Sequence, residues 1–121
     1  MDYYLTTNFT ANEFACKCHC GVLAKMDHDF MAKLEAMRRL LRRSFKITSG
    51  FRCDDHNKNL KGNANSSHLN GMAADILCVT AEDRYRLVGA AIRAGFTGIG
   101  IDKRFIHVDN HQYSPRKIWI Y

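Results

Sequence analysis

Several features of common protein classes are missing from this sequence. It has no apolar run approaching the roughly 20 residues that a membrane-spanning helix needs, so we expect no membrane insertion. The N-terminus has neither the basic start nor the apolar run of a secretory signal. We therefore expect synthesis in the cytoplasm and delivery by other means. One proline, no repeats and no low-complexity linker in 121 residues predict a single domain over residues 1–121, which we expect to be monomeric.

Negative charge is also scarce, because 12 acidic residues face 18 Lys and Arg and the net charge is +6. A basic protein encounters anionic polymers readily. The densest basic run, residues 38–46, falls at the end of an expected helix, where cations complement the helix dipole; a phosphate or cell-wall contact is the alternative. No organised set of base-reading or stacking residues accompanies this run, so we expect no nucleic-acid partner.

We expect no complete disulfide framework, because the five cysteines are an odd number and a chain of this length can form a core without disulfides. They are Cys16, Cys18, Cys20, Cys53 and Cys78. The first three alternate with other residues, which is closer than the spacing usual in structural zinc sites. Three interpretations stay open: a second metal site, a disulfide within the cluster or to Cys53, or reduced thiols in a turn.

Apolar periodicity predicts an α+β fold with two main helices packed on a small antiparallel or mixed sheet. Residues 10–13 read as a capping box before a short helical turn. Helices are expected over residues 27–43 and from about 80 to 95, and strands at 46–51, 73–79, 98–101, 105–108 and 117–120. The expected inward-facing residues are Phe30, Met31, Leu34, Met37, Leu40 and Leu41 on the first helix, and Leu87, Val88, Ala91 and Ile92 on the second.

Two segments carry the chemistry. Residues 66–75, with the sequence SSHLNGMAAD, and residues 105–109, with the sequence FIHVD, place His68, Asp75 and His107 among small and apolar residues. Two histidines and a carboxylate form a ligand set that a catalytic zinc with one open position uses. A bend at Gly71 can bring the first two together. Since side chains alternate along a strand, His107 and Asp109 share one face and their neighbours point into the core.

The chain resembles the M15 group of zinc peptidases, the D-alanyl-D-alanine carboxypeptidases and phage endolysin relatives that share a fold with the hedgehog signalling domain. The resemblance rests on residues 49–52 (SGFR) with Asn57 following, the Ser66-x-His68-x-x-Gly71-x-Ala73-x-Asp75 motif, residues 98–100 (GIG), residues 105–109 with Trp119 beyond, and an opening segment, residues 8–21, similar to the single-domain phage-type members. It implies a hedgehog/DD-peptidase-like fold over nearly the whole chain.

The family pattern assigns roles to individual residues. It implies Zn²⁺ held by His68, Asp75 and His107, with water at the fourth position, where the metal lowers the pKa of that water toward about 7. Arg52 matches the position that stabilises a developing oxyanion and binds substrate; a salt bridge to Asp54 or Asp55 is its alternative role. Ser66 and Asn57 are expected at the substrate, Ser66 as a hydrogen-bonding residue and not a nucleophile.

The general base is where the sequence departs from better-described members. Those place an acid three residues, or a histidine two residues, before the last zinc-binding histidine, whereas this chain has Arg104 and Phe105. We expect Asp109 to be the base, with Asp102 and His111 as further candidates. The alternative role for Asp109 is to hold His107 in place.

The resemblance also implies a substrate, because family members cut amide bonds in the stem peptides of bacterial peptidoglycan. We therefore expect a zinc peptidase of phage or prophage origin, acting on the cell wall after release or as part of a particle. An endopeptidase and a D-Ala-D-Ala carboxypeptidase are both compatible with the motifs. A non-catalytic zinc-binding recognition module of the same fold is the alternative.

Overall fold

The computed structural model describes residues 2–16, 25–53, 67–112 and 115–121. Five strands form one mixed sheet in the order β1-β2-β4-β3-β5. They are β1 (Ile47–Ser49), β2 (Ala73–Leu77), β3 (Gly98–Ile101), β4 (Phe105–Asp109) and β5 (Lys117–Ile120). All neighbouring strands are antiparallel except β3 and β5, which run parallel. The expected α+β class is therefore confirmed, and the sheet is mixed.

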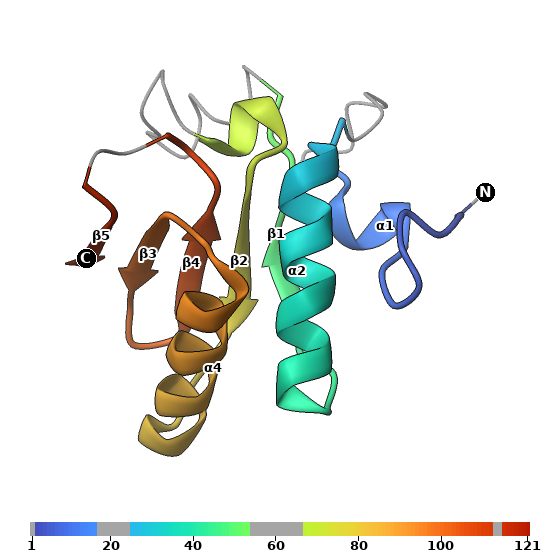
Figure 1. Cartoon of the computed structure of the whole chain (residues 1–121). Coiled ribbons are helices and arrows are strands. Elements are labelled where there is room, and N and C mark those ends of the chain that lie inside the picture. Colours follow the sequence, from blue (N-terminus) through green and yellow to red (C-terminus); the bar gives the residue numbers. More distant parts are fainter. Residues whose placement is uncertain (1, 17–24, 54–66, 113–114) are drawn as a thin grey trace.

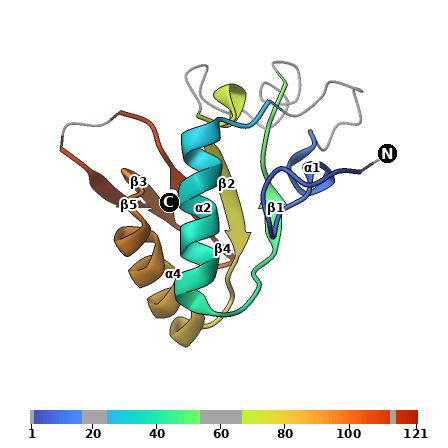
Figure 2. The same ribbon diagram turned by 45° about the vertical axis from the view of Figure 1, so that its right-hand side comes forward.

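Two long helices lie side by side on one face of this sheet (Figures 1 and 2). Helix α2 (His28–Leu41) begins at Asp27, whose carboxylate accepts a hydrogen bond from the Phe30 N–H. Helix α4 (Ala81–Ala94) begins at Thr80, whose side chain accepts from the Asp83 N–H, and ends at Gly95 with a φ of 95°. Side-chain caps of this kind satisfy N–H groups that lack a partner within the helix. The described residues contain no helix with the length and apolarity needed to cross a bilayer.

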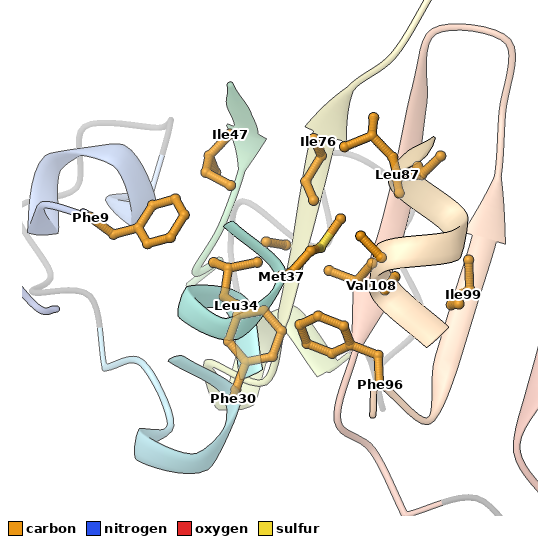
Figure 3. Packing of buried hydrophobic residues seen from close by; sticks show 14 of the residues in the cluster. Phe9, Phe30, Leu34, Met37, Ile47, Ile76, Leu87, Phe96, Ile99 and Val108 are labelled. Atoms are coloured by element: carbon orange, nitrogen blue, oxygen red, sulfur yellow. The ribbon is translucent and has the colours of Figure 1, made fainter. Parts of the chain in front are cut away.

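The core lies between the helices and the sheet (Figure 3). Phe30, Leu34 and Met37 of α2 are fully buried there, against alternate residues of the strands such as Ile76 and Val108. The prediction that Leu40 and Ile92 face the core is wrong, because Leu40 is 37% exposed and Ile92 is 53% exposed. Both side chains line a groove between α2 and α4 instead of the core.

Two short elements complete the fold at the edge nearest the expected metal site. Helix α1 (Ala11–Phe14) follows Thr10, whose N–H donates to the Glu13 carboxylate at 2.7 Å, as the capping box predicted. The 3₁₀ helix η1 (Ser67–Asn70) precedes β2, and Gly71 between them has a φ of 67°. A side chain at Gly71 would also collide with the Lys25 carbonyl. The expected bend at this glycine is therefore confirmed.

Candidate metal centre

Three buried side chains converge on the sheet face opposite the helices. His68 comes from η1, Asp75 from β2 and His107 from β4, and they are 2%, 7% and 6% exposed. One ligand atom from each lies within 4.8 Å of the other two. His68 Nε2 is 3.3 Å from Asp75 Oδ1, and His107 Nδ1 is 3.1 Å from the same oxygen. The two imidazoles and the carboxylate could therefore share one metal ion.

Strand register explains how residues distant in sequence meet here. Asp75 and His107 are direct partners across the antiparallel β2–β4 pair. Directly paired side chains lie on the same face of a sheet, so this register places both groups together. Their neighbours Ala74, Ile76, Ile106 and Val108 point to the other face and are fully buried in the core. The expected alternation along β4 is thus confirmed.

Each histidine has a second partner that fixes its ring. The Nδ1 atom of His68 is 2.6 Å from the Gly50 carbonyl oxygen. A carbonyl only accepts, so Nδ1 carries the proton and Nε2 is left as the ligand atom. His107 Nε2 is 2.6 Å from Asp109 Oδ2, which leaves Nδ1 facing Asp75. Partners of this kind set the tautomer and orientation of metal-binding histidines. The backbone role of Gly50 was not anticipated from the sequence, since no side-chain pattern marks a carbonyl.

Arg52 lies on the far side of the Asp75 carboxylate from the histidines. Its guanidinium is 3.5 Å from Asp75 Oδ2, while Oδ1 faces both rings. The Arg52 backbone N–H also donates to the His68 carbonyl at 3.1 Å. The arginine is thus anchored at the site from both its main chain and its side chain. Its alternative partners, Asp54 and Asp55, lie outside the described residues.

Burial and hydrogen bonding have opposite effects on the pKa values of the site residues. Burial alone would lower the pKa of His107, but its hydrogen bonds to Asp109 and Asp75 outweigh burial and raise the pKa to about 9. Burial would raise the pKa of Asp75, yet hydrogen bonds from His107 and His68 hold it below its ordinary value. Without metal, the site therefore keeps a protonated His107 between two carboxylates. A metal ion bound at these residues would take the place of that proton.

An aromatic side chain flanks His107. Gly100 is paired with His107 on one side and with Trp119 on the other, so all three belong to one row across the sheet. The Trp119 ring lies 5.4 Å from that of His107, and a Cβ at Gly100 would approach Trp119 Nε1 to 2.7 Å. Because Gly100 has no side chain, the indole ring of Trp119 can lie over this position, next to His107.

The predictions for the other site residues are only partly tested by the structure. Ser66 and Asn57 lie outside the described residues, so their substrate roles stay predictions. Asp102 lies in the β3–β4 turn, where it accepts a hydrogen bond from the Arg104 N–H at 3.1 Å. His111 follows β4, and its backbone N–H donates to Asp109 Oδ1 at 3.2 Å. Of the three candidate bases, Asp109 thus lies at the site, and His111 is joined to it through its backbone.

Residues 7–109 match the Peptidase M15 family model. This chain belongs to the M15 peptidase family. The match includes all three candidate ligands, Arg52 and Asp109, and it ends at the last residue of β4. No curated protein matches the chain.

The donor set of this M15 peptidase suits a metallopeptidase centre. Two imidazole nitrogens and one carboxylate oxygen are the donors of zinc sites that keep a position open for water or substrate. Both histidines have the orienting partners that such ligands need, and the site is shielded by burial. The residues present therefore fit a catalytic divalent metal, as the family implies.

Proposed function

We propose that this M15 peptidase is a zinc enzyme that hydrolyses an amide bond in the stem peptide of bacterial peptidoglycan. The convergence of His68 Nε2, Asp75 Oδ1 and His107 Nδ1 is the observation that supports it most directly. When bound there, zinc supplies the Lewis acidity that activates water and polarises the scissile carbonyl. The net charge of +6 suits a wall polymer rich in carboxylates.

The chain's own residues hold this chemistry in place. Asp75 presents one oxygen to the histidines and the other to Arg52, so the guanidinium stands beside the ligand cluster. A cation in that position can stabilise negative charge that develops on the substrate carbonyl oxygen in the transition state. Arg52 thereby serves as a positioning group for Asp75 and as the electrostatic partner of the reacting amide.

Asp109 is assigned here to the orientation of His107. Its side chain is 1% exposed, and its two oxygens contact His107 Nε2 and the His111 N–H. A carboxylate held in this way restrains the imidazole and raises its basicity as a ligand. The role of Asp109 as general base stays a prediction.

The test uses purified peptidoglycan and the zinc-loaded enzyme, with mass spectrometry of the released muropeptides. Cleavage between the terminal D-alanines and cleavage after L-alanine give products of different mass, so the assay also identifies the bond. The His68→Ala variant should release nothing, whereas His28→Ala, a substitution at the exposed start of α2, should act as the wild type does. Intact stem peptides after incubation with the zinc-loaded wild type at every pH tried would overturn the proposal.

The same experiment tests the competing function, a non-catalytic zinc-binding module that recognises the wall. Such a module would sediment with peptidoglycan and leave its stem peptides intact. Phage or prophage origin, and action on the wall after release or from a particle, complete the proposal. These two points rest on the resemblance of the opening segment to phage-type members.

A further inference from the structure

Two aromatic side chains lie on the same face of the sheet as the metal ligands. Trp119 belongs to β5, and Tyr121 continues that strand, since its N–H donates to the Ile101 carbonyl at 3.0 Å. Residues two positions apart on a strand point to the same face. Trp119 shares a row with Gly100 and His107, so both aromatic rings lie on the face that carries the metal ligands.

Both rings extend from β5 toward His107, across the glycine of β3. A Cβ at Gly100 would come within 2.7 Å of Trp119 Nε1 and of a Tyr121 ring carbon, so both rings lie over this glycine. The centroid of the Trp119 ring is 5.4 Å from that of His107. The Tyr121 ring is 5.5 Å from the ring of Phe105, which precedes His107 by two residues on β4. The two side chains therefore border the metal cluster.

The shape of this pair limits what it can bind. The ring planes of Trp119 and Tyr121 meet at 76°, with centroids 6.3 Å apart, and we call the pair the aromatic corner. Tyr121 is 62% exposed and Trp119 is half-buried, so a ligand can reach the rings. Rings at this angle contact a compact group from two sides and offer no continuous flat surface for a sugar ring. The aromatic corner is uncharged and mostly apolar, so it suits a small apolar group.

The two sides of the metal cluster differ in charge. The strand order places Arg52, which follows β1, beside Asp75 on one side, and the aromatic corner beside His107 on the other (Figure 1). A substrate that lies across the strands at the cluster would meet a cation at one end and uncharged rings at the other. A carboxylate of the substrate is therefore favoured toward Arg52, and an apolar group toward the aromatic corner.

We propose that Trp119 and Tyr121 bind the alanine side chain on the carbonyl side of the scissile bond and set the preference for alanine there. This inference rests on the proposed function, because the D-Ala–D-Ala and L-Ala–D-Glu bonds both have alanine on the carbonyl side. In both, the residue on the amino side carries a free carboxylate, the group favoured toward Arg52. The alanine methyl group would cover ring carbons that water otherwise contacts. The two rings select the substrate and transfer no proton.

The test compares two synthetic stem peptides that differ only in alanine or glycine on the carbonyl side of the bond identified by the muropeptide assay. One methyl group in an apolar pocket is worth about 10-fold or more in kcat/KM, so the zinc-loaded wild type should prefer alanine by that factor. Tyr121→Ala should lose most of this preference through a higher KM for the alanine peptide, with kcat and bound zinc close to wild type. A merely structural role would lower kcat or zinc content instead.

Two further variants serve as controls for Tyr121→Ala. Tyr121→Phe keeps the ring and should retain the preference for alanine. Tyr85→Ala removes an 85% exposed tyrosine from α4, on the other side of the sheet, and should also behave as wild type.

Tryptophan fluorescence measures binding separately from cleavage, because Trp119 is the only tryptophan in the chain. An analogue in which a CH₂–NH group replaces the scissile amide can bind without being cleaved. Its addition to the zinc-loaded wild type should shift the Trp119 emission to shorter wavelength, since the alanine methyl group displaces water from the indole. The matching glycine analogue should bind about 10-fold more weakly.

The outcomes distinguish this inference from the proposed function. A wild type that cleaves the alanine and glycine peptides equally well, or a preference that Tyr121→Ala leaves unchanged, would overturn the inference and leave the proposed function standing. Analogue binding without any change in Trp119 emission would do the same. An emission shift caused by an N-acetylglucosamine oligomer, and not by the peptide analogue, would assign the aromatic corner to the glycan instead. A wild type that neither binds nor cleaves any stem peptide would contradict both.

Discussion

Asp109 Oδ2 lies 2.6 Å from His107 Nε2, on the side of the imidazole opposite Asp75. The ring is therefore held between two carboxylates, one in the ligand cluster and one behind it. This arrangement leaves a single orientation in which Nδ1 faces His68 and Asp75. It also makes Asp109 a residue whose substitution separates metal binding from proton transfer.

The Asp109→Asn variant should bind zinc about 10- to 100-fold more weakly, because an amide holds the ring of His107 less firmly than a carboxylate does. At saturating zinc, its kcat should return close to the wild-type value if Asp109 only orients the ring. A kcat that stays very low at saturating zinc would instead identify Asp109 as the general base. Metal titration and kcat measured across pH give both readouts, and Asp102→Asn, in the β3–β4 turn, serves as the control.

Substitution of His68 should remove the catalytic metal. The His68→Ala variant loses one ligand atom and the contact with the Gly50 carbonyl, so neither the metal nor the approach of β1 is held as before. We expect loss of peptidase activity and of zinc from this site, measured together by elemental analysis and muropeptide release. Full activity in His68→Ala would show that the metal centre lies elsewhere.

The metal-free protein should lose stability as the pH rises from about 6.5 to about 9. The pKa of His107 is raised from 6.5 to about 9 in the folded state, so folding favours the protonated ring. That contribution is fully present below pH 6.5 and disappears as the ring deprotonates. Denaturant unfolding in the presence of a chelator measures it. The His107→Gln variant should show a flatter dependence over this range, and an unchanged slope would contradict the assignment.

The Arg52→Lys variant should lose much of its kcat while keeping the metal. Lysine retains the charge but lacks the planar fork that lies beside Asp75 Oδ2. Loss of a donor that stabilises a developing oxyanion costs on the order of 10²- to 10³-fold in kcat. Steady-state kinetics at saturating zinc check this expectation. Arg93→Lys, on the exposed last turn of α4, should behave as wild type.

Gly100 and Gly89 form a matched pair for a stability test. A methyl group at Gly100 would meet Trp119 Nε1 and a Tyr121 ring carbon, each at 2.7 Å. We expect Gly100→Ala to destabilise the fold by about 1–3 kcal/mol through overpacking and to displace Trp119 from His107. Gly89→Ala, in α4 with nothing within 4 Å of the added carbon, should instead stabilise by about 0.5–1 kcal/mol. Denaturant unfolding and tryptophan fluorescence measure the two effects.

Local sequence determined most of the secondary structure of this protein. The capping residues Asp27 and Thr80 start the two long helices where the sequence predicts them, and Gly95 ends the second. Alternation along residues 105–109 correctly separated His107 and Asp109 from the core residues between them. Helix caps and the alternation of side chains along a strand involve residues only a few positions apart. A short stretch of sequence is therefore enough to predict them.

Tertiary structure decided the contacts that join distant segments. The parallel pairing of β3 with β5 brings Trp119 to His107, and no local pattern specifies that register. The Gly50 carbonyl behind His68, the position of Arg52 beside Asp75 and the meeting of Cys16 with Cys53 likewise depend on how β1 packs against its neighbours. The motifs and the family resemblance predicted the metal ligands. Strand register and burial determine which of their oxygen and nitrogen atoms face one another.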